Sequence, residues 1–141
     1  MDYIAIYNEY SDQDITRMVE VYKSVGWMNH DYHKVSIILN NSTHIAIAKL
    51  DDNIIGFARA LSDGVFNAAI YDVVVCPEYQ RSGIAKLLLE NLLAQFEDLS
   101  CIHLISTTGN EAFYKKIGFK KLTTGMAIYH KSHLEKEYTE G

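Results

Sequence analysis

Residues 71–86 read Tyr71-Asp72-Val73-Val74-Val75-Cys76-Pro77-Glu78-Tyr79-Gln80-Arg81-Ser82-Gly83-Ile84-Ala85-Lys86, and a leucine-rich run continues from there to Phe96. The apolar segment is rich in β-branched residues and ends at the only proline of the chain, which favours a strand that stops there. A short polar turn with one glycine follows, and the leucine-rich run has helical periodicity. The pattern therefore predicts a strand, a glycine turn and a helix in that order.

The turn of this unit is suited to bind an anion. The N–H groups of a first helical turn have no partner inside the helix, and the helix dipole favours negative charge there. Gly83 would let an oxyanion approach the backbone without a Cβ in the way, and Arg81 adds a charge suited to phosphate oxygens. A plain helix start without a ligand is the alternative interpretation, because many strand–turn–helix units bind nothing.

Two well-known phosphate-binding patterns are absent from the sequence. The chain has no Gly-x-x-x-x-Gly-Lys-Ser/Thr, which argues against a P-loop kinase or ATPase. It also has no Gly-x-Gly-x-x-Gly, which argues against a dinucleotide-binding fold.

Two ordered motifs resemble those of one known family. Gln80-x-x-Gly83-x-Ala85, behind the valine strand, resembles the acetyl-coenzyme A pyrophosphate loop of the GNAT acetyltransferase superfamily, whose pattern is Gln/Arg-x-x-Gly-x-Gly/Ala. Residues 110–119, Asn110-Glu111-Ala112-Phe113-Tyr114-Lys115-Lys116-Ile117-Gly118-Phe119, are similar to the family's later region, which ends in Tyr-x-x-x-Gly-Phe. The family more often has glycine at the position of Ala85. The resemblance covers roughly residues 45–129.

The resemblance implies an α/β (α+β) GNAT fold. The family has a mixed, mostly antiparallel central sheet of about seven strands with helices on both faces, splayed between the fourth and fifth strands to hold the pantetheine arm. Periodicity and turn signals in this chain agree with that order. They predict strands at 3–7, 43–50, 54–61, 67–76, 101–106, 119–122 and 126–131, and helices at 12–24, 32–39, 82–97 and between Asn110 and Gly118. The charged tail from Ser132 is expected to fray.

Length and composition predict one domain spanning residues 1–141. The net charge of −5 argues against a nucleic-acid partner. No apolar run is long enough to cross a membrane, and Met1-Asp2-Tyr3-Ile4 does not resemble a signal peptide. Cys76 and Cys101 should lie at opposite ends of parallel strands as free thiols, so a cytoplasmic protein is expected. A homodimer is an option that the sequence leaves open.

The resemblance also assigns roles to individual residues. It implies that the backbone amides of residues 81–86 hold the pyrophosphate, while the unpaired backbone of residues 73–75 pairs with the pantetheine amides. A backbone N–H near Val74 would stabilise the oxyanion of the reaction. The expected coenzyme A-binding residues are Val73, Val74, Val75, Gln80, Arg81, Ser82, Gly83, Ile84, Ala85, Lys86, Asn110 and Tyr114.

Two side chains are candidates for proton transfer. By resemblance, Tyr114 would protonate the departing coenzyme A thiolate as general acid, and packing between Phe113 and Phe119 is the alternative. Asp72 is the lone carboxylate in a buried-looking strand, so it is predicted to be either a general base acting through water or a hydrogen-bonded structural residue. Asn110 has two compatible interpretations, a cap for the following helix and a contact with coenzyme A.

The segment between the first two predicted helices lines the acceptor pocket in the GNAT family. Trp27 and Tyr32 would provide aromatic walls or cation–π contacts to an amine there, with core packing as the alternative. The pairs His30-x-x-His33 and His130-x-x-His133 lack an evident third ligand, so no metal is expected. Neither cysteine has a convincing base partner, which argues against an acetyl-cysteine intermediate.

These features predict an acetyl-coenzyme A-dependent N-acetyltransferase that transfers the acetyl group directly to a primary amine of a small molecule. Two alternatives stay open at this level. One is transfer to an amine of a protein or peptide, and the other is a non-catalytic regulatory module that binds acyl-coenzyme A.

Overall fold

The computed structural model describes residues 3–140 and divides into two compact units, one up to Leu104 and one from Ile105. The first unit contains a five-stranded sheet and most of the helices. Its elements are β1 (Ile4–Tyr7), α1 (Asp12–Ser24), α2 (Tyr32–Asn40), β2 (His44–Leu50), β3 (Asn53–Ser62), β4 (Asn67–Val75), the 3-10 turn η1 (Pro77–Tyr79), α3 (Ile84–Ala94) and β5 (Cys101–Leu104).

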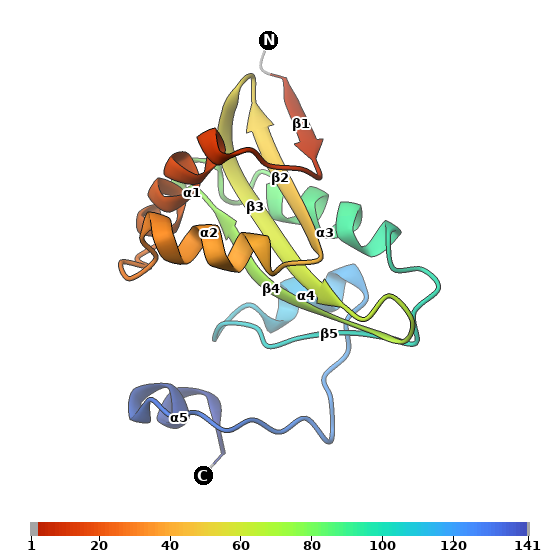
Figure 1. Cartoon of the computed structure of the whole chain (residues 1–141). Coiled ribbons are helices and arrows are strands. Elements are labelled where there is room, and N and C mark those ends of the chain that lie inside the picture. The colour runs from red at the N-terminus through yellow and green to blue at the C-terminus, as the bar shows by residue number, and fades with distance from the viewer. Residues whose placement is uncertain (1–2, 141) are drawn as a thin grey trace. The chain divides into compact units, whose positions relative to one another are not determined.

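The sheet is mixed, with the strand order β1-β2-β3-β4-β5. The first four strands pair antiparallel: β1 leads to β2 through α1 and α2, and short turns join β2 to β3 and β3 to β4. Strand β5 is parallel to β4 because α3 crosses over between them. Helices α1 and α2 lie over one face of this sheet, and α3 lies over the other (Figure 1). The predicted mixed sheet with helices on both faces is confirmed for this unit.

Helical periodicity explains how the two faces are covered. On α1, Ile15, Met18 and Tyr22 are buried and belong to one core cluster with Phe57 of β3 and Val74 of β4. On the opposite face, α3 buries the apolar stripe made of Ile84, Leu88, Leu89 and Leu92. Each helix is therefore held by an amphipathic stripe that matches the 3.6-residue period.

Adjacent leucines of α3 offer a direct test of this packing. Leu88 is fully buried, whereas Leu87 is 44% exposed. We expect Leu88→Ala to lower the free energy of unfolding by about 2–5 kcal/mol, because it leaves a cavity in the core. The matched variant Leu87→Ala should change it by less than about 0.5 kcal/mol. Urea denaturation measures both; equal losses would show that α3 does not pack as described.

The second unit contains two short helices, α4 (Glu111–Ile117) and α5 (Ser132–Tyr138). The described chain forms five strands, so the prediction of about seven is wrong: the hairpin expected at 119–122 and 126–131 is absent from residues 3–140. Met126 of this segment is 97% exposed, so no apolar face is buried there. An isolated two-stranded hairpin is marginal without such burial, which accounts for the difference.

The prediction that the tail frays from Ser132 is also wrong. Residues 132–138 form α5, and the ring of Tyr138 stacks on Tyr129 with centroids 5.9 Å apart. Glu137 accepts a hydrogen bond of 3.0 Å from Thr108, which ties the helix to the start of the same unit. These contacts between residues distant in sequence are not visible in the charge pattern that suggested fraying.

Candidate active site

Strand β4 continues beyond the point where its pairing with β5 ends. The parallel register runs from Asn67 opposite Cys101 to Ile70 opposite Leu104, while β4 extends to Val75. In the described part of the chain, the last residues of β4 therefore have a partner strand only on the β3 side. Because β5 itself ends at Leu104, the splay between the fourth and fifth strands stays a prediction, but β4 does have a free edge beyond Ile70.

The alternation of backbone groups shows which residues face the free edge of β4. The N–H of Cys76 donates to the carbonyl of Ile55 across β3 at 2.8 Å, so the polar groups of Val74, two residues earlier, also face β3. The carbonyl of Val75 instead accepts a 2.9 Å hydrogen bond from the side chain of Gln80. Val75, rather than Val74, thus directs its backbone to the free edge.

The predicted anion loop forms a tight turn at the start of α3. Arg81 and Gly83 both adopt left-handed backbone conformations, with φ of 65° and 87°. Because these conformations interrupt helical geometry, α3 begins at Ile84 and not at Ser82 as predicted. The Ser82 hydroxyl donates to the carbonyl of Tyr79, which closes the turn.

The first turn of α3 is open to a ligand. Gly83 occupies the N-cap position and no side chain caps the helix, so the first-turn N–H groups have no side-chain acceptor. A Cβ placed on Gly83 would meet no atom within 4 Å. Arg81 and Lys86 are both exposed beside this turn. Free amides, open space and two cations fit the pyrophosphate of coenzyme A.

Asp72 lies within β4 and is held by two hydrogen-bond donors. Its Oδ2 accepts from the Tyr22 hydroxyl at 2.9 Å and from Arg59 Nε at 2.6 Å. Burial, together with the neighbouring Asp72 carboxylate, raises the pKa of Tyr22 far above its ordinary value, so this hydroxyl remains a donor. The structure confirms that this partly buried carboxylate is hydrogen-bonded; its role as a general base stays a prediction.

Sequence reasoning did not single out Tyr22 or Arg59 as site residues. Tyr22 was one of several apolar positions at helical spacing. Arg59 is a single cation in an otherwise apolar strand, and such a residue usually requires a carboxylate partner. That pairing signal could have connected Arg59 with Asp72, the lone carboxylate of the next strand.

An aromatic cluster adjoins this carboxylate. The rings of Trp27 and His30 stack on Tyr22 with centroid distances of 5.6 and 4.4 Å, and Phe57 contacts Tyr22 edge-on at 5.0 Å. Trp27 is therefore brought next to the Asp72 site. Tyr32, its predicted companion, is the first residue of α2 and is 48% exposed, and within residues 3–140 its ring does not join the aromatic cluster around Tyr22.

In the second unit, Tyr114 packs between two phenylalanines. Its ring lies 5.1 Å from that of Phe113 and 5.8 Å from that of Phe119, both in edge-on geometry. Burial raises the pKa of Tyr114. Asn110 precedes α4 as predicted, but its side chain does not cap the helix: it donates instead to the Thr107 hydroxyl at 2.5 Å. The acid role of Tyr114 and the coenzyme A contact of Asn110 stay predictions.

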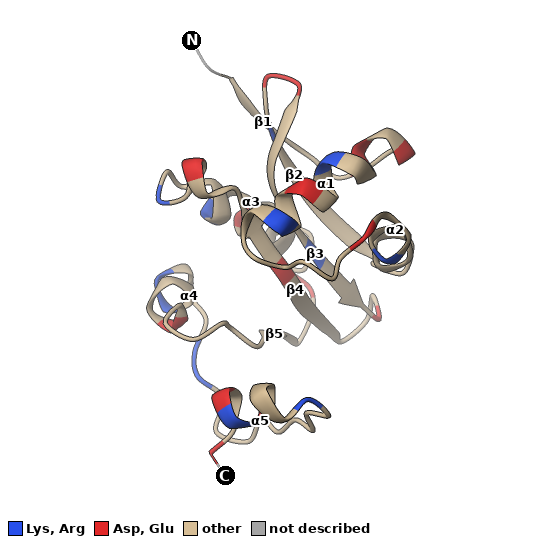
Figure 2. Cartoon of the chain, turned by 90° about the vertical axis from the view of Figure 1, so that its left-hand side faces the viewer, with Lys and Arg blue, Asp and Glu red and all other residues tan. Residues whose placement is uncertain are grey.

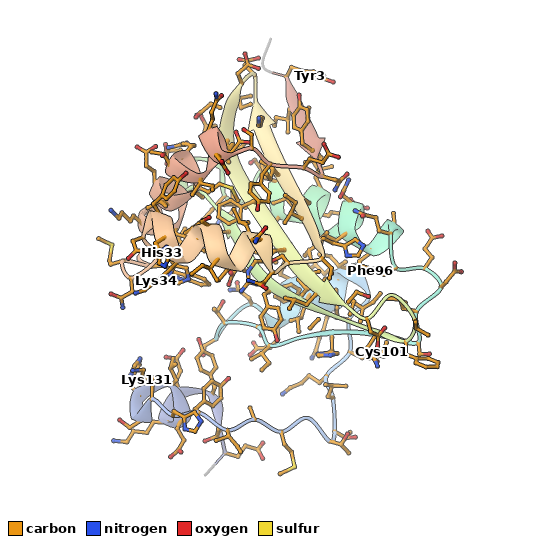
Figure 3. The ribbon with its side chains drawn as sticks, viewed as in Figure 1. Tyr3, His33, Lys34, Phe96, Cys101 and Lys131 are labelled. Carbon is orange, nitrogen blue, oxygen red and sulfur yellow. The ribbon has the colours of Figure 1, made fainter. Side chains whose placement is uncertain are left out.

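The histidines and cysteines singled out in the sequence show no sign of a shared metal site or a disulfide in the described chain. The side chain of His33 projects outward from α2 beside that of Lys34 (Figure 3), and no group of three or more metal-ligating side chains occurs among residues 3–140. Both cysteines are free, and Cys101 pairs with the start of β4 whereas Cys76 follows its end, as expected.

The helices carry charges of both signs, and none of those described is a candidate membrane span. Lys and Arg segments are interspersed with Asp and Glu segments along the helices (Figure 2). Within the described residues, no helix is both long enough and apolar enough to span a lipid bilayer.

Comparison with known proteins places the chain in a family. The family model described as acetyltransferase (GNAT) family matches residues 4–119. The ycf52 N-acetyltransferase of Pyropia yezoensis is 42% identical over 109 residues, which are 73% of this chain and 63% of that protein. Histone acetyltransferase TAP1 of Glycine max is 31% identical over 128 residues, which are 82% of this chain and 55% of that protein. The chain therefore spans less than two thirds of either relative.

Solved structures agree at the level of the fold. A GNAT family acetyltransferase of Streptococcus pneumoniae superposes with a TM-score of 0.74 at 26% identity, covering 93% of this chain and all of that one. The glucosamine-6-phosphate N-acetyltransferase of Arabidopsis thaliana has the same TM-score of 0.74 at 16% identity, over 92% of this chain and 99% of that one, which is a likeness of fold alone. The family match begins at residue 4, well before the part of the chain that the two motifs cover. By its fold, its motifs and these matches, the chain belongs to the GNAT acetyltransferase family.

Proposed function

We propose that this protein is an N-acetyltransferase that moves the acetyl group of acetyl-coenzyme A directly to a primary amine of a small molecule. One observation carries the proposal. The free edge at the end of β4 leads, through Pro77–Tyr79, directly into an uncapped helix start with Gly83 in a left-handed conformation. An edge for amide groups followed by a site for phosphates matches the order of groups in coenzyme A.

The residues of this region divide the binding of acetyl-coenzyme A between them. The first-turn amides of α3, with Arg81 and Lys86 nearby, would hold the pyrophosphate. The outward backbone groups near Val75 would pair with the pantetheine amides, as an added strand does. Val73, Val74, Gln80, Ser82, Ile84 and Ala85 complete the proposed set in this unit. Asn110 and Tyr114 of the second unit are proposed from their sequence motif alone. Bound acetyl-coenzyme A supplies an activated acyl group with a thiolate as leaving group.

Direct transfer requires few protein groups. A free amine attacks the thioester carbonyl, and a backbone N–H at the free edge of β4 stabilises the charge on oxygen. The attacking nitrogen gives up a proton to water and the C–S bond breaks; Tyr114 protonates the departing sulfur and is reprotonated from solvent. The proposal includes no acetyl-enzyme, because Cys76 is buried and neither cysteine of the described chain has a base within hydrogen-bond distance. The two partners of Asp72 favour its hydrogen-bonded role over that of a general base.

The small-amine proposal rests on the cluster around Tyr22. Trp27 and His30 are fixed on Tyr22, and flat aromatic rings contact a compact ammonium through cation–π interactions. A second candidate is the amine of a protein or peptide. The relative named histone acetyltransferase TAP1, at 31% identity, favours that reading. The two classes differ in the acceptor and not in the acetyl-coenzyme A chemistry.

One experiment tests the function and separates these acceptors. Thiol release from acetyl-coenzyme A is measured with the purified chain against a panel of small primary amines, lysine-containing peptides and peptides with a free N-terminus. We expect turnover with small amines and intersecting lines in a double-reciprocal initial-rate plot, because both substrates must be bound together. Peptide-only turnover would support the second candidate. Coenzyme A binding without turnover of any acceptor would support a regulatory module.

A further inference from the structure

Strand β4 contains a β-bulge at Asp72. Phe57 of β3 pairs with Val74, and Arg59 pairs with Tyr71. Two residues of β4 therefore lie between these pairs, opposite a single residue of β3. The extra residue lies between Tyr71 and Val74, where Asp72 has a φ of 40°. A bulge bends its strand and increases the local twist. Because the pairing with β5 ends at Ile70, the bulge coincides with the start of the free edge.

A left-handed conformation is unusual for a non-glycine residue, although aspartate and asparagine tolerate it better than most. It persists only where surrounding contacts hold it. The contacts here are the two hydrogen bonds to Oδ2, from Tyr22 of α1 and from Arg59 of β3. The side chains of Asp72 and Arg59 are 12% and 15% exposed, so water competes little for these bonds.

Both donors are themselves fixed by other contacts. Arg59 donates a second hydrogen bond of 3.3 Å to the Ser42 hydroxyl, and its guanidinium lies 5.1 Å from the ring centre of Tyr71. Tyr22 is fully buried among the aromatic rings described above. The carboxylate is thus anchored from a helix on one side and from the neighbouring strand on the other.

We propose that Asp72 is a positioning residue: held by Tyr22 and Arg59, it fixes the bulge that turns the backbone of Val75 to the free, coenzyme A side of β4. The inference rests on the proposed function for what this backbone binds. The same contacts weigh against Asp72 as the proton acceptor. Protonation of Oδ2 would give up its ion pair with Arg59, a cation that never titrates in the neutral range.

Three substitutions separate positioning from proton transfer. Tyr22→Phe removes one oxygen atom and keeps the aromatic stack. Asp72→Asn removes the negative charge but keeps an acceptor oxygen and the tolerance for a left-handed backbone. Tyr71→Phe, on the neighbouring residue, keeps the ring beside Arg59 and is the matched control.

Two readouts are used for each variant. The first is the amide ¹⁵N–¹H resonances and hydrogen exchange of residues 73–75, which need no ligand. The second is the Kd of coenzyme A by calorimetry, with kcat for the best acceptor. Positioning predicts that Tyr22→Phe and Asp72→Asn both shift the amide resonances of residues 73–75 and speed the exchange of the Val74 amide, which faces β3. Both should also raise the Kd about 10-fold, the usual cost of one lost backbone hydrogen bond. Tyr71→Phe should match wild type in both readouts.

A general base gives the opposite pattern. Asp72→Asn would then lower kcat by about 10²–10⁴-fold with an unchanged Kd and unchanged amides, and Tyr22→Phe would behave as wild type. Either that pattern or unshifted amides in both variants overturns the inference. A wild-type protein that does not bind coenzyme A overturns the proposed function, while the amides still decide whether Asp72 holds the bulge. If Asp72→Asn does not fold, Tyr22→Phe decides alone.

Discussion

Gly83→Asp should abolish coenzyme A binding, whereas Gly83→Asn should weaken it only about 10-fold. Both residues tolerate the left-handed backbone of this position better than other side chains, and a Cβ there meets no neighbouring atom, so the turn should survive either change. The two side chains have nearly the same shape. At about 5 Å from the pyrophosphate, an added negative charge costs about 3 kcal/mol at an effective dielectric constant near 20, which is more than about 100-fold in Kd.

Calorimetry with coenzyme A measures the two affinities, and circular dichroism at the same temperature checks that each variant is folded. Raising the salt concentration should narrow the gap between the two variants, because the difference between them is electrostatic. A folded Gly83→Asp variant that binds coenzyme A as wild type does would place the pyrophosphate elsewhere.

Tyr114→Phe should lower kcat about 100-fold and leave the affinity for acetyl-coenzyme A almost unchanged. As the thiolate departs, negative charge builds on sulfur, so a hydroxyl directed at that atom acts mainly in the transition state and its loss appears in kcat. General-acid assistance is worth about 10²–10⁴-fold, and a thiolate needs only the lower part of that range. Burial raises the pKa of Tyr114, so its hydroxyl is protonated at neutral pH, as a general acid requires, although it is a weaker acid than an exposed tyrosine.

Phenylalanine preserves the ring that packs against Phe113 and Phe119, so the stability of the variant should stay close to wild type. Tyr129→Phe, in the same unit, is the control for loss of a tyrosine hydroxyl and should keep wild-type kcat. If folded Tyr114→Phe turns over its best acceptor within about twofold of wild type, below the usual range for a general acid, water protonates the thiolate and Tyr114 is structural.

Local patterns in the sequence were enough to predict much of the first unit. Helix α1 spans Asp12–Ser24 as expected, because its apolar residues repeat at the helical period and Ser11 precedes a first turn with Asp14, whose carboxylate accepts the Ser11 N–H at 3.0 Å. The β2–β3 hairpin and β4 also begin and end within two residues of the prediction. Each of these elements is specified by residues that are neighbours along the chain.

The C-terminal part shows where local patterns are insufficient. Residues 119–131 have the alternation and glycine turn of a hairpin, yet they form no strand in the described structure. A strand is stable only when it pairs with another strand and packs one face against a helix or a second sheet. Both partners can lie far away in the sequence. The helix α5 differs from prediction for a related reason, since the stacking of Tyr138 on Tyr129 depends on tertiary geometry.

The sequence by itself determined the family, the strand–turn–helix unit and the position of Gly83 at its turn, because residue types at fixed short spacings carry that information. Tertiary structure alone decided the surroundings of Asp72. Tyr22 is 50 residues away and Arg59 is 13 residues away, and only the packing of α1 against β3 and β4 brings their donors to one carboxylate oxygen. It also decided that Val75, and not Val74, faces the free edge, since a bulge and a pairing register depend on two strands at once.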